Sequence, residues 1–221
     1  MHIEPGIVTG AKLLLSYATA ATAGAYTLKT AFDALRAQGA LSLIARSAIA
    51  TALVFTFFEV LPHMPVGVSE VHLILGSTLF LILGAAPAAI GLALGLLTQG
   101  LFFAPFDLPQ YGMNVTTLLV PLFGLQLLAK RLIAPGTPYV ELRYTQALAL
   151  STAYQGGIVG WVGFWAFYGQ GFGAVSQVAT FGVAYMTVIL VEPLVDLGVL
   201  AVAKRLNALR GSALVTPRLY A

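Results

Sequence analysis

The sequence has 221 residues, of which 59% are apolar and only 9% are charged, and its formal net charge is +3. A soluble domain carries roughly a quarter charged residues, so this composition excludes an ordinary soluble protein. No cysteine is present, which excludes disulfides and thiolate metal sites. The short alternating segments of a membrane β-barrel are also missing, and the small positive charge is typical of membrane topology rather than nucleic-acid binding.

Apolar runs separated by Pro- and Gly-containing loops predict an all-α, multi-pass membrane protein with about seven transmembrane helices. Each run approaches the roughly 20 residues that cross a bilayer core of about 30 Å. The predicted spans cover residues 7–35, 43–61, 71–83, 88–103, 113–129, 145–168 and 174–203, with a turn over residues 84–87. The first is rich in small residues, which allow close helix packing in lipid. The third is short. We expect a single integral membrane domain with its helical bundle over residues 7–203.

The distribution of basic residues predicts the orientation of the chain. With seven spans and the N-terminus outside, ten of the eleven basic residues fall on one side, which should be cytoplasmic. Residues 204–221 then form a cytoplasmic tail. The ten are Lys29, Arg36, Arg46, Lys130, Arg131, Arg143, Lys204, Arg205, Arg210 and Arg218. The opposite, outer side receives all three histidines, so the predicted location is the cytoplasmic (inner) membrane.

The first two residues, Met1 and His2, form a possible metal chelate. The N-terminal amine, the next amide nitrogen and the imidazole of His2 offer three nitrogens to one ion, and we expect Met1 to be retained because a large residue follows it. A second imidazole would complete a planar four-nitrogen site, which suits Ni(II) and Cu(II) and accepts Co(II). His72, expected at the mouth of the third span, is the preferred fourth ligand. His63, in a Pro-flanked loop, is the second choice.

Several short motifs resemble one family of metal transport proteins. Residues 1–6 read Met-His-Ile-Glu-Pro-Gly, and residues 65–76 read Pro-Val-Gly-Val-Ser-Glu-Val-His-Leu-Ile-Leu-Gly. Residues 99–103 read Gln-Gly-Leu-Phe-Phe, and residues 112–115 read Gly-Met-Asn-Val. In order and spacing, these motifs resemble those of the membrane-embedded substrate-capture subunits of energy-coupling-factor cobalt and nickel transporters (the CbiM/NikM type).

The resemblance implies that residues 1–6 tuck inward and that Met1, His2 and His72 coordinate the metal. It also implies that Asn114 and Ser69 support the metal-binding loop. The transported substrate would be Ni²⁺ or Co²⁺, and the nitrogen set does not distinguish them. The implied partners are a transmembrane coupling subunit and cytoplasmic ATPases. This chain has no G-x-x-x-x-G-K-[ST] motif, so we expect it to be a transport subunit and not itself an ATPase.

Two other functions stay open. One is a structural or assembly subunit without a metal site of its own. The other is a membrane enzyme with a zinc ion held by His63, His72 and either Glu59 or Glu70, although no H-E-x-x-H motif is present.

A pair of acidic residues in the last span also allows two interpretations. Glu192 and Asp196 are four residues apart and therefore share one face of the helix. They form either a face that couples the chain to a partner or a pair near the cytoplasmic boundary.

Overall fold

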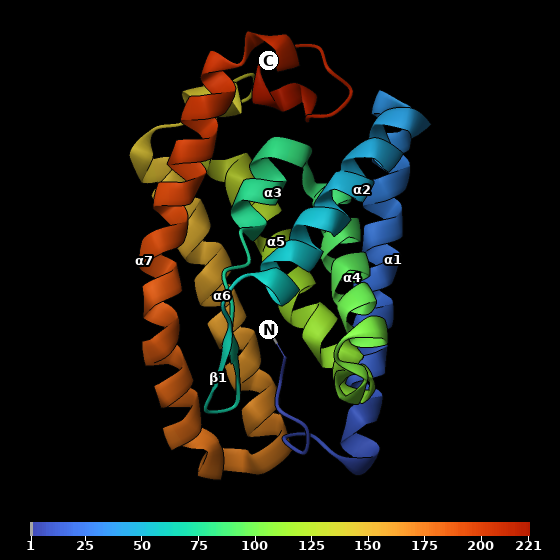
Figure 1. Cartoon of the computed structure of the whole chain (residues 1–221), viewed down its shortest axis with the longest axis vertical. Coiled ribbons are helices and arrows are strands. Elements are labelled where there is room, and N and C mark those ends of the chain that lie inside the picture. Colours follow the sequence, from blue (N-terminus) through green and yellow to red (C-terminus); the bar gives the residue numbers. More distant parts are fainter. Residues whose placement is uncertain (1) are drawn as a thin grey trace.

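The protein is a bundle of seven α-helices, seen in a computed structural model that describes residues 2–221 except for the side chain of Asn207 (Figure 1). The helices are α1 Leu13–Gln38, α2 Ala40–Phe55, α3 Gly76–Leu83, α4 Ala85–Phe102, α5 Tyr111–Leu132, α6 Tyr144–Gln170 and α7 Val175–Arg205. A π-helical turn, Thr56–Val60, continues α2. The expected all-α membrane architecture is confirmed.

Four segments of the described chain are long and apolar enough to cross a membrane: Ala40–Val60, Ala85–Phe102, Pro105–Leu132 and Tyr144–Arg205. The last of these segments contains both α6 and α7. Helix α1 has 26 residues, but its Thr, Ser, Gly and charged residues lower its mean hydropathy, and it is not one of the four segments. The predicted set of seven transmembrane helices is thus supported only in part.

The predicted third span, residues 71–83, is not a membrane-spanning helix. Helix α3 has eight residues and is about 12 Å long at 1.5 Å per residue, less than half the bilayer core. It begins at Gly76 because Leu75, the residue before it, adopts a left-handed conformation with φ 55°. Apolar composition alone does not reveal this break.

A short β-hairpin precedes α3 where the sequence predicted only a loop. Strands β1 Met64–Val66 and β2 Ser69–Val71 pair antiparallel. At the turn, Gly67 has φ +64°, and a Cβ atom there would lie 2.3 Å from the carbonyl oxygen of Gln177 in α7. Only glycine allows both this backbone conformation and this close approach. The hairpin is therefore packed directly against the start of α7.

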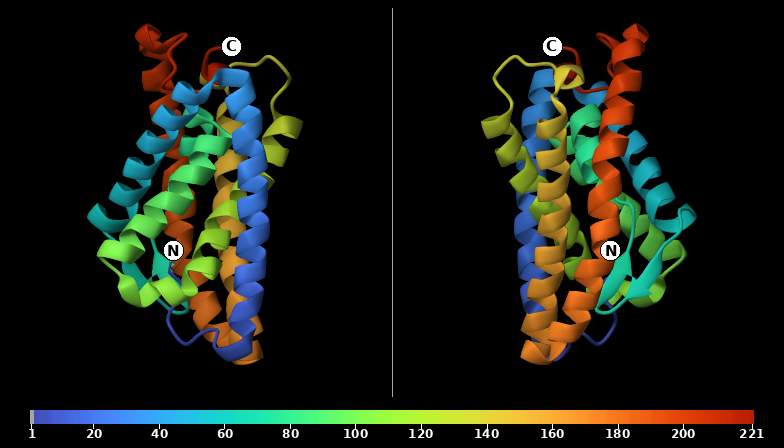
Figure 2. Two further views of the ribbon diagram at one scale, coloured as in Figure 1. Left: turned by 90° about the vertical axis from the view of Figure 1, so that its right-hand side faces the viewer. Right: turned by 90° about the vertical axis from the view of Figure 1, so that its left-hand side faces the viewer.

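Small residues set the closest helix contact, between α2 and α4. A Cβ atom added at Gly91 or Gly95 would come within 2.6 Å of Ala50 or Val54, respectively. Such close approach of backbones is how helices associate in lipid, where the hydrophobic effect between them is weak. The hairpin lies between α7 and these two helices (Figures 1 and 2).

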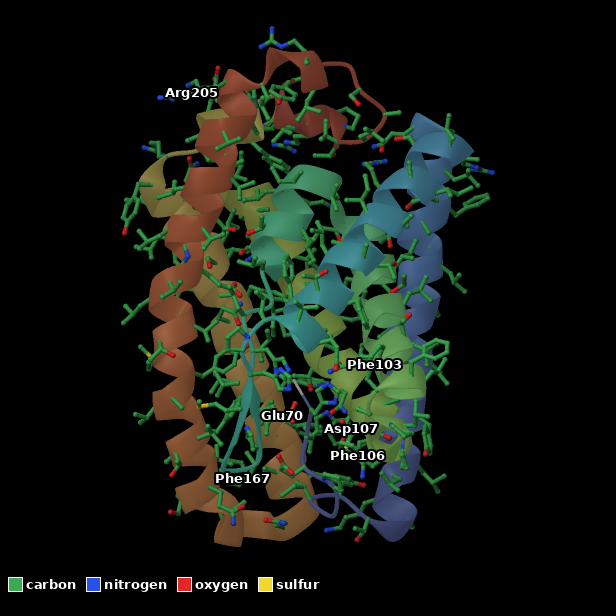
Figure 3. The ribbon with its side chains drawn as sticks, viewed as in Figure 1. Glu70, Phe103, Phe106, Asp107, Phe167 and Arg205 are labelled. Carbon is green, nitrogen blue, oxygen red and sulfur yellow. The ribbon has the colours of Figure 1, made fainter. Side chains whose placement is uncertain are left out.

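The bundle places the two ends of the chain at different depths. The C-terminal residues lie at one end of the molecule, together with the last turn of α7 and Arg205, whereas the N-terminal segment lies between the helices (Figures 1 and 3). Glu70 and Asp107 lie in the other half of the molecule, near that segment (Figure 3). Arg205 thus lies in the opposite half of the bundle from Glu70 and Asp107 (Figure 3).

Candidate metal centre

The N-terminal segment enters the bundle and pairs with the hairpin. Ile3 forms an antiparallel bridge with Ser69, and the amide of Glu70 donates to the carbonyl oxygen of His2 at 3.1 Å. The Ser69 hydroxyl donates to the same carbonyl at 2.9 Å. Asn114 Oδ1 accepts the amide of Ile3 at 2.9 Å. Ser69 and Asn114, both predicted to support the metal loop, therefore contact residues 2 and 3 directly.

His2 lies inside the protein, with 3% of its surface exposed. Its Nε2 atom is 2.8 Å from Gln99 Oε1, and its Nδ1 atom is 2.6 Å from Asp107 Oδ2. Its ring centroid is 5.7 Å from that of His72. Both ring nitrogens thus face polar groups, and the ring packs close to a second imidazole.

The orientation of the Gln99 amide fixes the tautomer of His2. The Gln99 Nε2 group faces two acceptors, Phe58 O at 3.4 Å and Glu59 Oε2 at 3.2 Å. Its Oε1 atom must then accept the hydrogen bond from His2 Nε2, which carries a proton. The lone pair of a neutral His2 ring is consequently on Nδ1. Asp107 Oδ2 lies 2.6 Å from that atom.

His72 follows β2 and is 1% exposed. It was predicted at a helix mouth, but three residues separate it from the start of α3, and it directly follows β2 instead. Its Nε2 atom is 3.5 Å from Glu70 Oε2. Burial, followed by the positive charges of neighbouring groups such as His2 and His63, lowers the pKa of His72 well below 6.5. The ring is therefore neutral at pH 7, the form that binds metal ions.

Three described residues bring ligand atoms together: His2, Glu70 and His72 each offer one atom, all within 4.8 Å of one another. Met1, the other predicted ligand, lies outside the described residues. Nitrogen and carboxylate ligands at this spacing suit a divalent transition metal. The structure thus brings together the two predicted histidines, although they are 70 positions apart in the chain.

His63, the second-choice ligand, does not join this group. It is exposed, and its ring stacks on that of His72 with centroids 4.9 Å apart and planes 6° apart. Parallel stacked rings direct their nitrogens side by side rather than toward a common point. The same geometry gives no support to a zinc site built from His63 and His72.

Sequence reasoning considered Glu70 beside His72 only in the zinc alternative, and it missed Gln99 and Asp107 as neighbours of the histidines. Glu70 and His72 are two residues apart at the end of a strand, and this spacing places both side chains on one face. That alternation was a usable signal, but the strand itself was not predicted. Gln99 lies in the apolar helix α4, where a polar residue indicates a functional or packing contact. Nothing in the sequence pairs it with His2.

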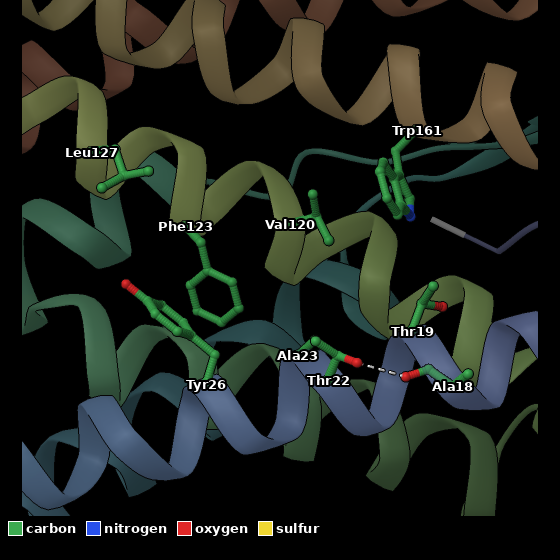
Figure 4. A pocket seen from close by; sticks show the side chains of 9 residues that line it. All are labelled: Ala18, Thr19, Thr22, Ala23, Tyr26, Val120, Phe123, Leu127 and Trp161. Carbon is green, nitrogen blue, oxygen red and sulfur yellow. Dashed lines mark hydrogen bonds between the residues drawn. The ribbon is translucent and has the colours of Figure 1, made fainter.

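A separate apolar cavity of about 520 Å³ lies between α1 and α5 (Figure 4). It is lined by Ala18, Thr19, Thr22, Ala23, Tyr26, Val120, Phe123, Leu127 and Trp161. The Thr22 hydroxyl is bound to the carbonyl of Ala18 at 2.9 Å within α1. This lining includes no histidine or carboxylate, so it offers no suitable ligand to a metal ion.

Comparison with protein families gives a match that covers nearly the whole chain. Residues 2–208 match the family described as the cobalt uptake substrate-specific transmembrane region. Neither the curated proteins nor the solved structures compared give a significant match. The family match includes the N-terminal segment, the hairpin and all seven helices. The chain therefore belongs to the family of substrate-specific membrane components of cobalt uptake, which are transport proteins rather than enzymes.

Proposed function

We propose that this chain is the subunit of a divalent metal importer that captures Co²⁺ or Ni²⁺ at the outer face of the membrane. The ligands would be the amine of Met1, the amide nitrogen and Nδ1 atom of His2, and the ring of His72. The observation that carries the proposal is the burial of His2 and His72 with ring centroids 5.7 Å apart. Two imidazoles this close inside a membrane protein favour a function over a packing role.

The hydrogen bonds of His2 support this choice of ligand atom. With Nε2–H donated to Gln99, the lone pair is on Nδ1. Nδ1 is also the ring atom that closes a six-membered chelate with the amide nitrogen of the same residue. Metal-bound histidines usually donate their other nitrogen to a carbonyl or carboxylate oxygen, as Nε2 does here. The entering ion would bind Nδ1 on the side that faces Asp107.

The acidic residues around the site favour a cation over an anion. Glu70 and Asp107 each lie within 3.5 Å of a histidine nitrogen. Glu4 is near both acidic residues, and partial burial, then the charges of Glu70 and Asp107, raise its pKa. A divalent ion would relieve the repulsion among these carboxylates. Four nitrogens in a plane would disfavour tetrahedral Zn²⁺ and oxygen-seeking Mg²⁺.

The charge distribution supports an orientation with the N-terminus outside and the C-terminus in the cytoplasm. The basic pairs Lys130–Arg131 and Lys204–Arg205 end α5 and α7, respectively, and Arg36 lies in the last turn of α1. An excess of basic residues marks the cytoplasmic side. The chain would then use seven crossings, with the hairpin and α3 together making the third, in the cytoplasmic membrane. Its partners would be a transmembrane coupling subunit and cytoplasmic ATPases.

A change at the N-terminus tests the proposal. Protein purified with its own first residue should hold about one Co²⁺ or Ni²⁺ per chain, measured by elemental analysis after removal of free ions. A few residues added before Met1 convert the amine into an amide and move it away, so the bound metal should be lost. The His63→Ala variant should keep its metal, because His63 lies outside the group. Unchanged binding by the extended protein would disprove the chelate.

A further inference from the structure

The segment that connects His72 to α3 depends on side chains of α7 for its conformation. Residues 72–75 belong to neither a strand nor a helix, so their amides lack regular partners. Leu75 has φ 55°, the only positive value at a non-glycine residue in the described chain. Such a conformation is costly for a residue with a side chain and persists only where the surroundings hold it.

Glu192 of α7 supplies the missing partners. Its Oε1 atom accepts the amides of Ile74 at 2.9 Å and Leu75 at 2.7 Å, two and three residues after His72. Its Oε2 atom accepts a hydrogen bond from the amide of Gln155 in α6. Glu192 is fully buried. One carboxylate therefore holds two consecutive backbone amides of the segment that carries a metal ligand.

Asp196, one turn further along α7, extends the same contact into α3. Its Oδ2 atom accepts a hydrogen bond from the Ser77 hydroxyl at 2.7 Å, and its Oδ1 atom accepts one from Thr78. Asp196 is 1% exposed. Both acidic residues of α7 thus contact residues 74–78. Both side chains are buried, so they do not form the exposed face for a partner that was one of the two interpretations of the sequence.

Neither carboxylate has a basic partner among the described residues. The ion pairs in that part of the chain join His2 to Asp107 and His72 to Glu70. A carboxylate inside a membrane protein is costly, and such residues are usually functional. Here the hydrogen bonds that stabilise the two buried carboxylates come mainly from the segment after His72 and from the first turn of α3. These contacts indicate that the carboxylates hold that segment in place.

We propose that Glu192 is a positioning residue for the metal site: it holds the backbone after His72 so that this ring faces His2. Asp196 fixes the adjoining turn of α3 to the same helix. A displacement of α7 would then pull the segment and move His72 away from His2, which couples ion release to the position of α7. This inference rests on the proposed function, because it assigns to His72 the role of a ligand.

Two conservative variants separate the geometry of Glu192 from its charge. Glu192→Gln keeps the length of the side chain and an oxygen that accepts the two amides. Glu192→Asp keeps the charge but withdraws the carboxylate by one methylene group. If Glu192 positions the segment, the Asp variant should lose about tenfold or more in Co²⁺ affinity, and the Gln variant should retain most of it. The reverse order would overturn the proposal.

Hydrogen–deuterium exchange of the ion-free protein gives a readout that does not depend on metal binding. In Glu192→Asp, the amides of Ile74 and Leu75 should exchange faster than in the unmodified protein. In Glu192→Gln, they should stay protected. Asp33→Asn, which removes an exposed carboxylate of α1, is the matched control and should change neither exchange nor affinity. Unchanged exchange of both amides in Glu192→Asp would also overturn the proposal.

The two readouts distinguish failure of this inference from failure of the proposed function. If the unmodified protein binds no Co²⁺, or binds it equally well after His72→Ala, the proposed function is wrong. If binding depends on His72 but Glu192→Asp changes neither affinity nor exchange, the metal site stands and the positioning role is wrong.

Discussion

His2 and His72 lie with their ring centroids 5.7 Å apart and their planes 34° apart, although the first belongs to the N-terminal segment and the second follows a β-hairpin. The two rings are close together because the N-terminal segment pairs with the hairpin. The hydrogen bonds from Ser69 and Glu70 to the carbonyl of His2 align the first residues along β2. A metal site made in this way depends on the register of a small sheet, because a shift by one residue would turn one imidazole to the opposite face.

The two loop histidines should differ in their importance. His72→Ala removes a buried ring that faces His2, so Co²⁺ or Ni²⁺ affinity should fall by at least about 100-fold, the upper range seen for changes next to a ligand. His63→Ala removes an exposed, stacked ring and should change affinity much less. Titration of both purified variants with a competing chelator measures this difference. A larger loss in His63→Ala would reverse the assignment of the ligand.

Gln99 should influence metal binding without touching the ion. Its Oε1 atom holds the His2 tautomer that has the lone pair on Nδ1. Gln99→Leu removes this acceptor with little change in volume, and affinity should fall by about 10- to 100-fold. Thr98→Ala is the control, because the half-buried Thr98 donates its hydroxyl hydrogen bond to Leu94 O within α4 and not to the His2 group. Equal affinity of the Gln99→Leu variant and the unmodified protein would remove Gln99 from the site.

Metal binding should weaken as the pH falls from about 7.5 to 5.5, because the N-terminal amine must lose a proton to coordinate. Burial keeps the pKa of His72 well below 6.5, so this ring needs no deprotonation in the folded protein. The unfolded chain, in contrast, takes up a proton at His72 near pH 6.5. The ion-free protein should therefore lose stability as the pH falls below that value. Dissociation constants and thermal unfolding across this range check both trends, and a flat affinity would argue against nitrogen ligands.

Gly67 should be essential for the placement of the hairpin. Alanine there must adopt φ +64° and place its Cβ atom 2.3 Å from the carbonyl oxygen of Gln177. Gly39→Ala is a matched control, because Gly39 also has positive φ, at 82°, but has no atom within 4 Å of an added Cβ. The control should cost about 1–2 kcal/mol of unfolding free energy, and Gly67→Ala clearly more. Gly67→Ala should also weaken metal binding, whereas equal unfolding free energies would show that the hairpin adapts.

Much of the architecture was predictable because the length of each apolar run and the positions of the charged residues are features of short stretches of sequence. Six of the seven predicted segments contain a long helix, since each has enough apolar residues for one. The third failed because a left-handed Leu75 and a hairpin replace its first half, and both are stabilised by distant groups such as Glu192 and Gln177. Similarly, the histidines were predictable as ligands from their chemistry. Glu70, Gln99 and Asp107 become neighbours only when three separate segments meet.

By itself, the sequence determined that this is a helical membrane protein with a nitrogen-rich start and a second histidine after a Pro- and Gly-containing loop. Composition and the chemistry of single residues do not depend on which residues come into contact in the folded chain. Only the tertiary structure decided that His2 and His72 face each other, that Gln99 selects the tautomer, and that α7 holds the segment after His72. These relationships join residues up to 118 positions apart, and hydrogen-bond geometry exists only after the chain has packed.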